Sequence, residues 1–521
     1  MFRWLWKHPL VITIIGGTIV FYIALLHGYI KNYRQNRRNK VELIAKMRNA
    51  DELLRKNLTE DALDIYKTIL TRPSLVKHPE LHARIKHQEG ICYYTLAQKT
   101  HKEDNLTRAI RAYEEALKIC TRKKDQTQYA TIQNNLGLAY WMLAGVRDKE
   151  DNLTRAIRAY EEALPIHNLK DYPFEYAQIQ NNLGNVYGAF SEVRNKEYNA
   201  TKAIRAYQKA LKIYTSEKYP KTYATTQTNL GTVYTGLAKV RDKEENLTLA
   251  IRSHQEALTV YTLEKNPTMY ATIQINLGAV YIDLAGVRDK EGNLTRAIRA
   301  YEEAIEVYTS KDYPLDYAST QNNLGATYRT LAEVRDKKQN AIKAIQAFGE
   351  ALTVCTSKNY PLEYARTKNN LGNAYATLAE VQSKQENLTR AVQAYEQALK
   401  IYTVKKYPLN YAQTQNNLGN AYGALVEIQS NEKNFSRTIE AYEEALKIYT
   451  RKKHPIMYAM TKNNLGIAYR RLAKVRDREE NLIKAIQAFK EALTVLSSDH
   501  YPLYYEKIIL NIDKAKRMME E

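Results

Sequence analysis

Carboxamide side chains recur at fixed intervals along this sequence, and they are the residues whose type and spacing could do chemistry. Near copies of the stretch QTQNNLGNAY, residues 413–422, place an asparagine two residues before a glycine. An amide carries a hydrogen-bond donor and an acceptor together, so a row of amides suits the backbone of an extended peptide. We interpret these asparagines as partner-binding residues: Asn135, Asn182, Asn229, Asn276, Asn323, Asn370, Asn417 and Asn464.

A second role for the same amides stays open at this point. They could bond to neighbouring helices and set only the geometry of a helical stack. The residue directly before each of them is also asparagine in most copies, but Thr228 and Ile275 replace it in two copies. That tolerance indicates a less demanding position, and it leaves both the ligand contact and the structural contact as hypotheses.

Motifs of known catalytic or cofactor sites are missing from the sequence. It contains no Walker loop, no dinucleotide fingerprint, no zinc-ligand spacing and no serine elbow. Three histidines and Cys92 lie at near-helical spacing, but Pro79 begins a helix between His78 and His82, which argues against a metal site. We predict a protein that is not an enzyme, has no metal or cofactor, and takes no small-molecule substrate.

Charge and cysteine content exclude other classes. The net charge is +21, but residues 1–40 hold seven Lys/Arg and no Asp/Glu, so the excess over the other residues is spread thinly. Stretches such as TRAIRAYEEALK mix both signs on one helix surface, which favours self-pairing over nucleic-acid binding. Three cysteines far apart in sequence cannot form a disulfide framework, so we expect a reducing compartment.

The N-terminal segment reads as a membrane anchor. Residues 9–26 contain no charged side chain, and as a helix they would span about 27 Å at 1.5 Å per residue, close to a bilayer core. The sequence therefore predicts a short flank at 1–8, a transmembrane helix at 9–28 and a basic juxtamembrane segment at 29–40. Since most basic residues follow the apolar stretch, the expected localisation is a single-pass membrane protein with its body in the cytoplasm.

That body is a repeat array with a period of 47 residues. Glycines mark every unit without one insertion: Gly90, Gly137, Gly184, Gly231, Gly278, Gly325, Gly372, Gly419 and Gly466. A proline eleven residues before nearly every glycine fits the first turn of a helix, where its missing N–H costs nothing. An asparagine such as Asn293 reads as the N-cap of a second helix. Each unit is therefore predicted to be two helices, with the glycine allowing close approach between them.

The unit resembles the tetratricopeptide repeat. The stretch NNLGNAY matches that family's Leu-Gly-x-x-Tyr signature, and AIRAYEEAL matches its Ala-x3-Phe/Tyr-x2-Ala-Leu signature. The long unit and double asparagine are most similar to the kinesin light chain branch. The resemblance implies an all-α right-handed superhelix of about ten helix pairs over 41–502, a capping helix at 503–521, and a concave groove lined by the first helices.

Residues at the predicted groove positions change along the array. Trp141 and Met142 make its N-terminal half partly apolar. Cations gather toward the C-terminus and would favour an acidic partner segment: Arg329, Arg366, Lys368, Arg470 and Arg471.

We predict from these features a membrane-anchored scaffold that binds a segment of a partner protein in its groove. The alternative is a sensor or regulatory subunit that works with a separate signalling enzyme. Neither reading involves nucleic acid.

Overall fold

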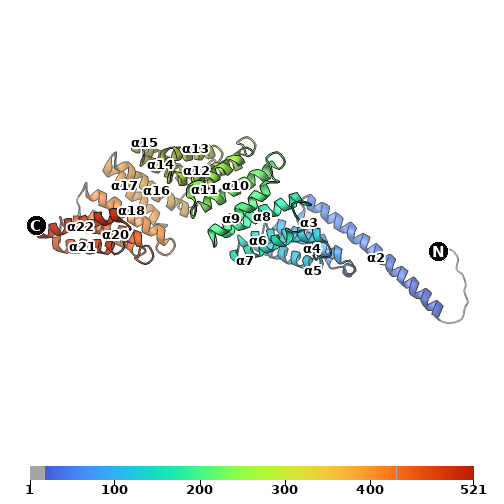
Figure 1. Ribbon diagram of the computed structural model, residues 1–521. Helices are drawn as coiled ribbons and strands as arrows, with labels where there is room; N and C mark the ends of the chain where they lie inside the picture. Colours follow the sequence, from blue (N-terminus) through green and yellow to red (C-terminus); the bar gives the residue numbers. More distant parts are fainter. Residues whose placement is uncertain (1–17, 430) are drawn as a thin grey trace. The chain divides into compact units, whose positions relative to one another are not determined.

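The computed structural model describes residues 18–429 and 431–521, and within them it contains helices and no strand. Its contacts divide the chain into two units, Met1–Val233 and Tyr234–Glu521, with the boundary inside α10 (Pro220–Leu237). Figure 1 shows helix following helix from the blue α2 to the red α22. The predicted all-α solenoid is confirmed for this part of the chain.

The first unit begins with α2, a long helix that continues into the array. Its helices are α2 (Thr18–Arg55), α3 (Thr59–Leu70), the 3-10 helix η1 (Pro73–Lys77), α4 (Pro79–Leu96), α5 (Lys102–Ile119), α6 (Gln126–Ala144), α7 (Lys149–Ala163), α8 (Pro173–Ser191) and α9 (Lys196–Leu211), followed by the start of α10. Consecutive helices pack as pairs, α2 with α3, α4 with α5, α6 with α7 and α8 with α9.

The second unit repeats the same scheme and ends with an additional helix. It contains the end of α10, then α11 (Lys243–Leu258), α12 (Pro267–Ala285), α13 (Lys290–Ile305), α14 (Pro314–Ala332), α15 (Lys337–Val354), α16 (Pro361–Ala379), α17 (Lys384–Leu399), α18 (Pro408–Val426), α19 (Glu432–Leu446), α20 (Pro455–Leu472), α21 (Arg478–Leu493) and α22 (Pro502–Glu520). Five pairs run from α12–α13 to α20–α21, and α22 packs against α21.

Prolines set the helix boundaries as the sequence predicts. Pro314 and Pro361 occupy the first turn of α14 and α16, where a missing N–H leaves no hydrogen bond unmade. Pro165 shortens a second helix, because α7 ends at Ala163.

The asparagines predicted as N-caps have a different role, and that prediction is wrong. The second helices begin three residues earlier, after a residue in the left-handed conformation such as Asp289 at φ 42°. Asn293 is 1% exposed, and its Nδ2 donates to the carbonyl of Arg288 at 2.8 Å, so it fastens the inter-helix turn onto the helix. The same bond recurs at Asn105, Asn152, Asn199, Asn246, Asn340, Asn387 and Asn481.

The glycine that recurs every 47 residues lies against an aromatic ring of the second helix in its own unit. In α12, a Cβ added to Gly278 would lie 2.6 Å from the ring of Tyr301 on α13, far inside contact distance. Tyr301 is itself 1% exposed and packs with Leu294 and Ala297. The predicted close approach of the two helices in each unit is confirmed at this position.

First helices of successive pairs also touch one another directly. In the first unit α4 contacts α6 and α6 contacts α8; in the second unit the contacts join α14, α16, α18, α20 and α22. We call the surface that α14, α16, α18 and α20 share in the second unit the first-helix face. It places equivalent residues of neighbouring repeats beside one another.

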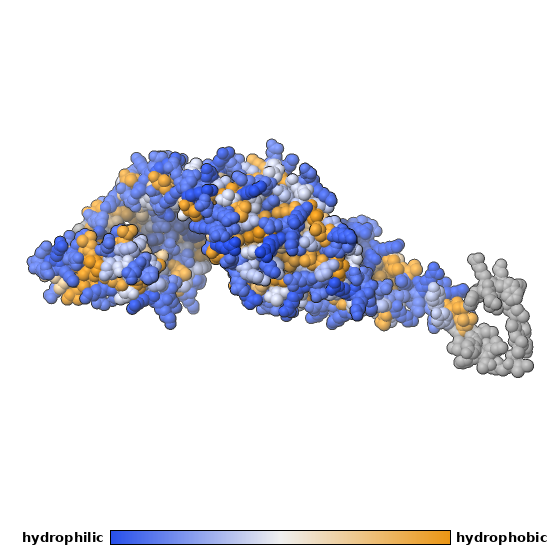
Figure 2. Space-filling model, in the orientation of Figure 1, coloured by the Kyte–Doolittle hydropathy of each residue, from blue (hydrophilic) through white to orange (hydrophobic). Residues whose placement is uncertain are grey.

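Ion pairs link neighbouring repeats at the surface. Arg194 pairs with Glu150 at 2.6 Å and Arg288 with Glu244 at 2.8 Å, each across 44 residues. Exposed pairs of this kind contribute roughly 0–1 kcal/mol each. Figure 2 shows hydrophilic residues over most of the visible face, with hydrophobic residues in scattered patches.

The predicted membrane localisation is contradicted. Among residues 18–429 and 431–521, no helix combines the length and the apolar character that crossing a bilayer requires. The physical reason lies in α2, whose apolar beginning runs into Lys31 and Arg34 within the same helix, and whose later turns bury Leu43 and Met47 against the array. The first part of the predicted span, residues 9–17, lies outside the described residues.

Candidate functional site

The eight asparagines two residues before the glycines, here called the ladder asparagines, mostly bond to the preceding repeat. In the first unit, Nδ2 of Asn182 donates to Asn134 at 3.2 Å, and Nδ2 of Asn229 donates to Asn185 at 3.0 Å. Asn135 lies 2.9 Å from Nε2 of His87. These bonds join first helices, as the structural hypothesis for the amides requires.

The second unit continues the ladder. Asn370 donates to Asn322 at 3.2 Å, and Asn464 donates to Asn420 at 3.2 Å. Asn417 reaches two acceptors, Asn369 at 3.3 Å and Asn373 at 3.1 Å. The cap helix α22 joins the ladder through Asn511, which donates to Asn463.

Two sequence positions supply these acceptors. One is 48 residues before the donor, as Asn322 is for Asn370, and the other is 44 residues before it, as Asn420 is for Asn464. Asn276 and Asn323 lie half-buried on α12 and α14. Neither side chain makes a hydrogen bond within the described residues. For Asn323 both acceptor positions carry apolar residues, Ile275 and Ala279.

Asparagines one residue after a glycine form a second layer of contacts that sequence reasoning missed. Asn373 accepts a hydrogen bond at 2.7 Å from the hydroxyl of Tyr395, and Asn420 accepts one at 2.8 Å from Tyr442. Both asparagines also accept from the next ladder asparagine. The signal was present in the sequence as an asparagine followed 22 residues later by tyrosine.

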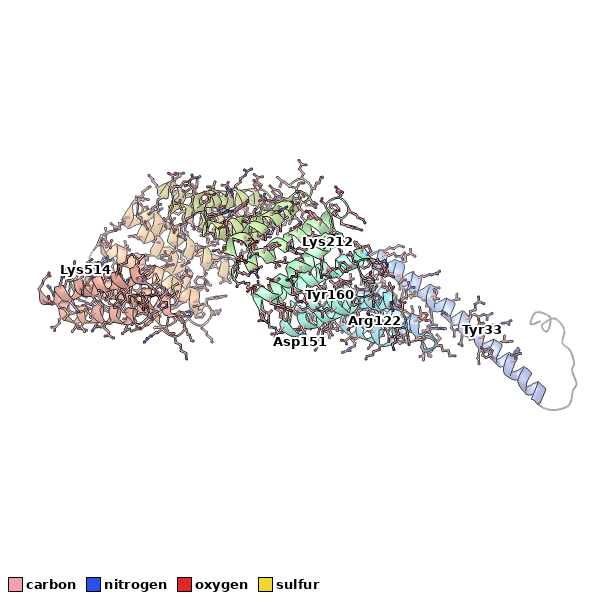
Figure 3. The ribbon with its side chains drawn as sticks, in the orientation of Figure 1. Tyr33, Arg122, Asp151, Tyr160, Lys212 and Lys514 are labelled. Atoms are coloured by element: carbon pink, nitrogen blue, oxygen red, sulfur yellow. The ribbon has the colours of Figure 1, made fainter. Side chains whose placement is uncertain are left out.

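The tyrosine hydroxyl has no partner where that asparagine is absent. Tyr160 has Leu138 in place of the asparagine, and its buried hydroxyl makes no hydrogen bond within the described residues. Burial raises the pKa of this phenol well above its usual range. Figure 3 places Tyr160 among the helices of the first unit.

Replacing Tyr160 with phenylalanine is expected to raise the free energy of unfolding by about 1 kcal/mol, because it removes a buried unpaired polar group. Phe348 and Phe489 fill the same place in other repeats, so the ring fits without a hydroxyl. The control is Tyr207→Phe, which removes a 2.8 Å bond to Asn185 and should lower the same energy by about 1 kcal/mol. Urea denaturation followed by circular dichroism measures the free energy of unfolding of both variants. A loss of stability in Tyr160→Phe as well as in Tyr207→Phe would contradict the conclusion that the Tyr160 hydroxyl is unpaired.

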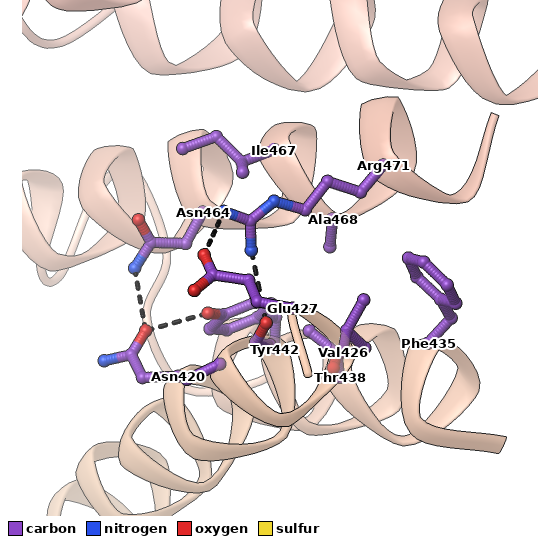
Figure 4. Close-up of a pocket in the computed structure, with 12 residues that line it drawn as sticks. Asn420, Val426, Glu427, Phe435, Thr438, Tyr442, Asn464, Ile467, Ala468 and Arg471 are labelled. Carbon is purple, nitrogen blue, oxygen red and sulfur yellow. Dashed lines mark hydrogen bonds and ion pairs between the residues drawn. The ribbon is translucent and has the colours of Figure 1, made fainter. Parts of the chain in front are cut away.

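A hollow opens on the first-helix face between α18 and α20, and we call it hollow A. It encloses about 220 Å³. Figure 4 shows Asn420 and Asn464 at one end and Arg471 and Glu427 across the opening. Its floor comes from α18, α19 and α20 and includes Gly423, Ala424, Phe435, Thr438, Tyr442, Ile467 and Ala468.

Hollow B lies one repeat earlier, between α16 and α18, with a volume of about 400 Å³. Its lining is shifted by 47 residues from that of hollow A, so Ala376 replaces Gly423 and Leu388 replaces Phe435. Asn417 takes the place of Asn464. The two hollows are therefore equivalent sites on consecutive repeats.

Small side chains open these hollows. The position occupied by Ala376 and Gly423 carries Trp141 on α6 and Arg329 on α14, while α8 has a glycine there, Gly188. Trp141 and its neighbour Met142 are half-buried and pack against the core of the first unit. Trp141 and Met142, the predicted apolar groove residues, thus occupy on α6 the place that is open at hollow A and hollow B.

The predicted groove cations are largely bound within the chain. Arg329 pairs with Glu333 at 2.9 Å and lies at the rim of hollow B. Arg471 donates to Glu427 at 2.6 Å and to the carbonyl of Gly423 at 3.2 Å, across hollow A.

Arg470 points instead toward the cap, where it donates to Asn511 at 3.1 Å. Burial, together with the neighbouring charge of Arg471, lowers the pKa of Arg470 below its usual range. Both arginines therefore hold helices together.

Lys368 and Arg366 differ from these cations. At the place of Lys368, Lys86 and Lys462 pair with Glu115 and Glu491 at 2.8 and 2.7 Å. In the repeat of Lys368, the position of these glutamates is occupied by Gln397, which carries no charge. The ammonium of Lys368 lies 5.4 Å from the centre of the Tyr364 ring.

Burial lowers the pKa of Lys368. Arg366 is exposed on α16. Neither cation has an ion pair with a carboxylate in the described part of the chain, residues 18–429 and 431–521.

One family model matches part of this chain. Residues 372–403, from the glycine of α16 to just beyond α17, match the family model described as Tetratricopeptide repeat. The sequence has no match among curated proteins.

The solved structures that match this chain do so at low identity and low TM-score. The C-terminal part of a TPR repeat-containing protein from Cytophaga hutchinsonii is 16% identical, with a TM-score of 0.39, covering 62% of this chain and 99% of that one. The apo form of RapI is 15% identical, with a TM-score of 0.42, covering 79% and 97%. Yeast Tom70 is 11% identical, with a TM-score of 0.32, covering 92% and 96%.

TM-scores this low do not identify a family, so the assignment rests on the family model. That match covers one unit of a sequence that recurs with a fixed period of 47 residues. The family model therefore identifies residues 372–403 as a tetratricopeptide repeat, and the chain repeats this unit with that period.

Proposed function

We propose that the chain is a non-enzymatic scaffold that holds an extended segment of a partner protein on its first-helix face. The observation that carries this proposal is the pair of equivalent hollows on consecutive repeats, hollow A and hollow B. Both exceed the roughly 30 Å³ share of a water molecule many times over, so each has room for a side chain.

Repeat spacing favours an extended partner segment. Packed helices lie roughly 8–10 Å apart, and an extended chain advances about 3.3 Å per residue. A side chain about three residues after the first would therefore reach the second hollow. The apolar floor of each hollow, with Leu388 or Phe435 at the same place, fits apolar side chains at that interval.

We also propose that the partner segment carries an acidic residue, and that fewer cations of the chain contact it than the sequence predicts. Arg329 and Arg471 already face carboxylates of the chain, so they add little net positive potential. Arg366 and Lys368, which have no such carboxylate in the described residues, are the cations we propose for an acidic contact.

The unit length and paired asparagines support a further proposal, that the array is closest in kind to the kinesin light chain branch.

Filling hollow A tests the proposal. A Cβ at Gly423 would meet Thr438 Cγ2 at 3.5 Å, an ordinary contact, so Gly423→Leu should fold while its side chain occupies the hollow. The probe is a set of synthetic peptides selected from a random 12-residue display library on the purified full chain. We expect the peptide Kd to rise at least tenfold in this variant.

Gly349→Leu provides the matched control, because a Cβ there meets nothing within 4 Å and Gly349 lines neither hollow. This variant should bind the selected peptides like the wild type. Equal affinity of Gly423→Leu and wild type, or a library that yields no binder, would overturn the proposal.

A further inference from the structure

Positive charge gathers on two consecutive loops of the second unit, the loop from α17 into α18 and the loop from α19 into α20. Residues 400–411 contain three Lys/Arg and residues 447–458 contain four, and neither stretch contains Asp or Glu. None of these residues lines hollow A or hollow B. We call six exposed cations of the two loops the basic edge: Lys400, Lys405, Lys406, Arg451, Lys452 and Lys453.

The equivalent stretches of the neighbouring repeats carry no such excess. Residues 306–317 hold one Lys and three Asp/Glu, and residues 353–364 hold one Lys and one Glu. On the other side, residues 494–505 hold one Asp and no Lys or Arg. The charge is therefore confined to two of the loops between consecutive repeats.

The basic edge is not neutralised within the chain. None of its six cations forms an ion pair with a carboxylate among residues 18–429 and 431–521. Arg451 donates to the carbonyl of Thr494 at 3.3 Å, which leaves its charge uncompensated. Glu444, near the end of α19, pairs with Lys447, which is not one of the six.

Packing holds the two loops beside one another. Ala412 on α18 packs with Tyr449 in the second loop and with Tyr458 on α20. In each loop a threonine hydroxyl accepts a hydrogen bond from the backbone N–H three residues later, that of Lys406 or Lys453. The two loops therefore form the same turn, and their cations lie at equivalent places on adjacent repeats.

The helices that follow the loops add to the positive potential. Helices α18 and α20 have no acidic residue in their first turn, whereas α14 and α16 have Asp316 and Glu363 there. The unpaired N–H groups at a helix start carry partial positive charge. Both helix starts thus favour an anion at the same edge as the six cations.

Apolar side chains stand exposed among the cations. Val404 and Leu409 belong to the first stretch, and Ile456 and Met457 belong to the second. A ligand with apolar groups between its negative charges would contact both kinds of side chain.

We propose that the basic edge binds an acidic segment of a partner protein in which carboxylates alternate with apolar side chains. Adjacent helices lie roughly 8–10 Å apart, which an extended chain covers with about three residues. Carboxylates at that interval meet both loops, and complementary charge speeds and orients the encounter.

The narrow extent of the basic edge favours a protein segment over nucleic acid or a lipid surface. A larger polyanion would also lie across residues 353–364 and 494–505, whose net charges are 1 − 1 = 0 and 0 − 1 = −1. This surface is separate from the two hollows, so the inference does not depend on the proposed function.

A labelled peptide and the full chain test the assignment. The probe is a fluorescein-labelled peptide in which glutamates alternate with leucine and serine, and its control has glutamine in place of every glutamate. We expect the full chain to bind the acidic peptide and not the glutamine peptide, with affinity falling as salt screens the charges. Replacing four lysines of the basic edge with glutamine should raise the Kd at least tenfold: Lys405→Gln, Lys406→Gln, Lys452→Gln and Lys453→Gln.

A matched variant removes the same charge elsewhere in the second unit. It replaces four exposed lysines that have no ion pair within the described residues: Lys265→Gln, Lys311→Gln, Lys358→Gln and Lys474→Gln. Lys311 and Lys358 stand at the place of Lys405 and Lys452 in earlier repeats. The Kd of this variant should stay within threefold of wild type, and both variants should melt like wild type because the substituted side chains are exposed.

Several results would overturn the inference. One is equal affinity of the two quadruple variants, and another is a wild-type chain that does not bind the acidic peptide. Tighter binding of oligouridylate, or of vesicles containing phosphatidylserine, through the same four lysines would assign the basic edge to a different class of partner. Gly423→Leu should bind the acidic peptide like wild type, and a tenfold loss in this variant would place the peptide in hollow A instead.

Discussion

Replacing Gly325 with alanine is expected to lower the free energy of unfolding by about 1–3 kcal/mol, the usual cost of overpacking a core. A Cβ at this position would lie 2.8 Å from Cε1 of Phe348 and 3.0 Å from Cζ. Phe348 has no exposed surface, so its ring cannot swing aside without displacing the buried neighbours Ala344 and Leu371. Helices α14 and α15 would have to separate, and their pairing is the unit of the fold.

Gly349→Ala, in α15 itself, is the matched control with the opposite sign. Gly349 is exposed in the interior of the helix, and a Cβ there meets nothing within 4 Å. Alanine should raise the free energy of unfolding by about 1 kcal/mol, because glycine is the poorer helix former. Urea denaturation followed by circular dichroism measures both variants, and a Gly325→Ala chain as stable as wild type would contradict the contact.

Much of the fold follows from the sequence because the physical causes are local. Proline at a fixed place forces a helix to begin there, and glycine every 47 residues signals a ring that needs the space of a missing side chain. The ring itself is in the sequence, as Tyr301 or Phe348, 23 residues after its glycine.

Side-chain partners are harder to read, and the asparagines show why. Asn293 and its equivalents stand near a helix start in a typical cap residue type, yet the helix begins before them and their amides bond backward to the turn. Whether the asparagine caps the helix or bonds to the turn depends on which turn residue takes the left-handed conformation. The residues found there are Asp, Asn, Ser or His, and these residue types do not determine that position.

The ladder asparagines raise the same difficulty across repeats. Their hydrogen bonds depend on residues 44 and 48 positions earlier, which only the packed array brings within reach. Once that geometry is known, the structural hypothesis accounts for the ladder asparagines that bond to the preceding repeat. The ligand hypothesis stays a prediction, and Asn276 and Asn323 are the members whose side chains make no hydrogen bond within the described residues.

Asn373 connects two of these contacts, and its loss is expected to be costly. It accepts from the Tyr395 hydroxyl at 2.7 Å and from Asn417 at 3.1 Å. Asn373→Ala leaves the Tyr395 hydroxyl, on a side chain only 2% exposed, without a partner. The expected loss in free energy of unfolding is about 1–3 kcal/mol, while Asn417 keeps its second acceptor, Asn369.

A double-mutant cycle separates the unpaired hydroxyl from the lost bond. Tyr395→Phe alone should cost about 1 kcal/mol, because the half-buried acceptor Asn373 keeps its hydrogen bond from Asn417. The double variant should be more stable than Asn373→Ala, since removing the hydroxyl removes the buried unpaired group; Ala326 with Phe348 is the same combination in the preceding repeat. Losses that simply add would show that the two side chains act independently.

Repeat arrays unfold in segments, so the site of the loss is measured as well as its size. Hydrogen exchange in Asn373→Ala should accelerate in α16 and α17 and leave α12 and α13 at wild-type rates, because the affected bonds join α16 to α17 and to α18. Uniform acceleration over the second unit would mean that the array responds as one cooperative body. A local response would show that each Tyr–Asn contact stabilises mainly its own repeat and the next. That property would let the array persist although Asn276 and Asn323 make no side-chain hydrogen bond within the described residues.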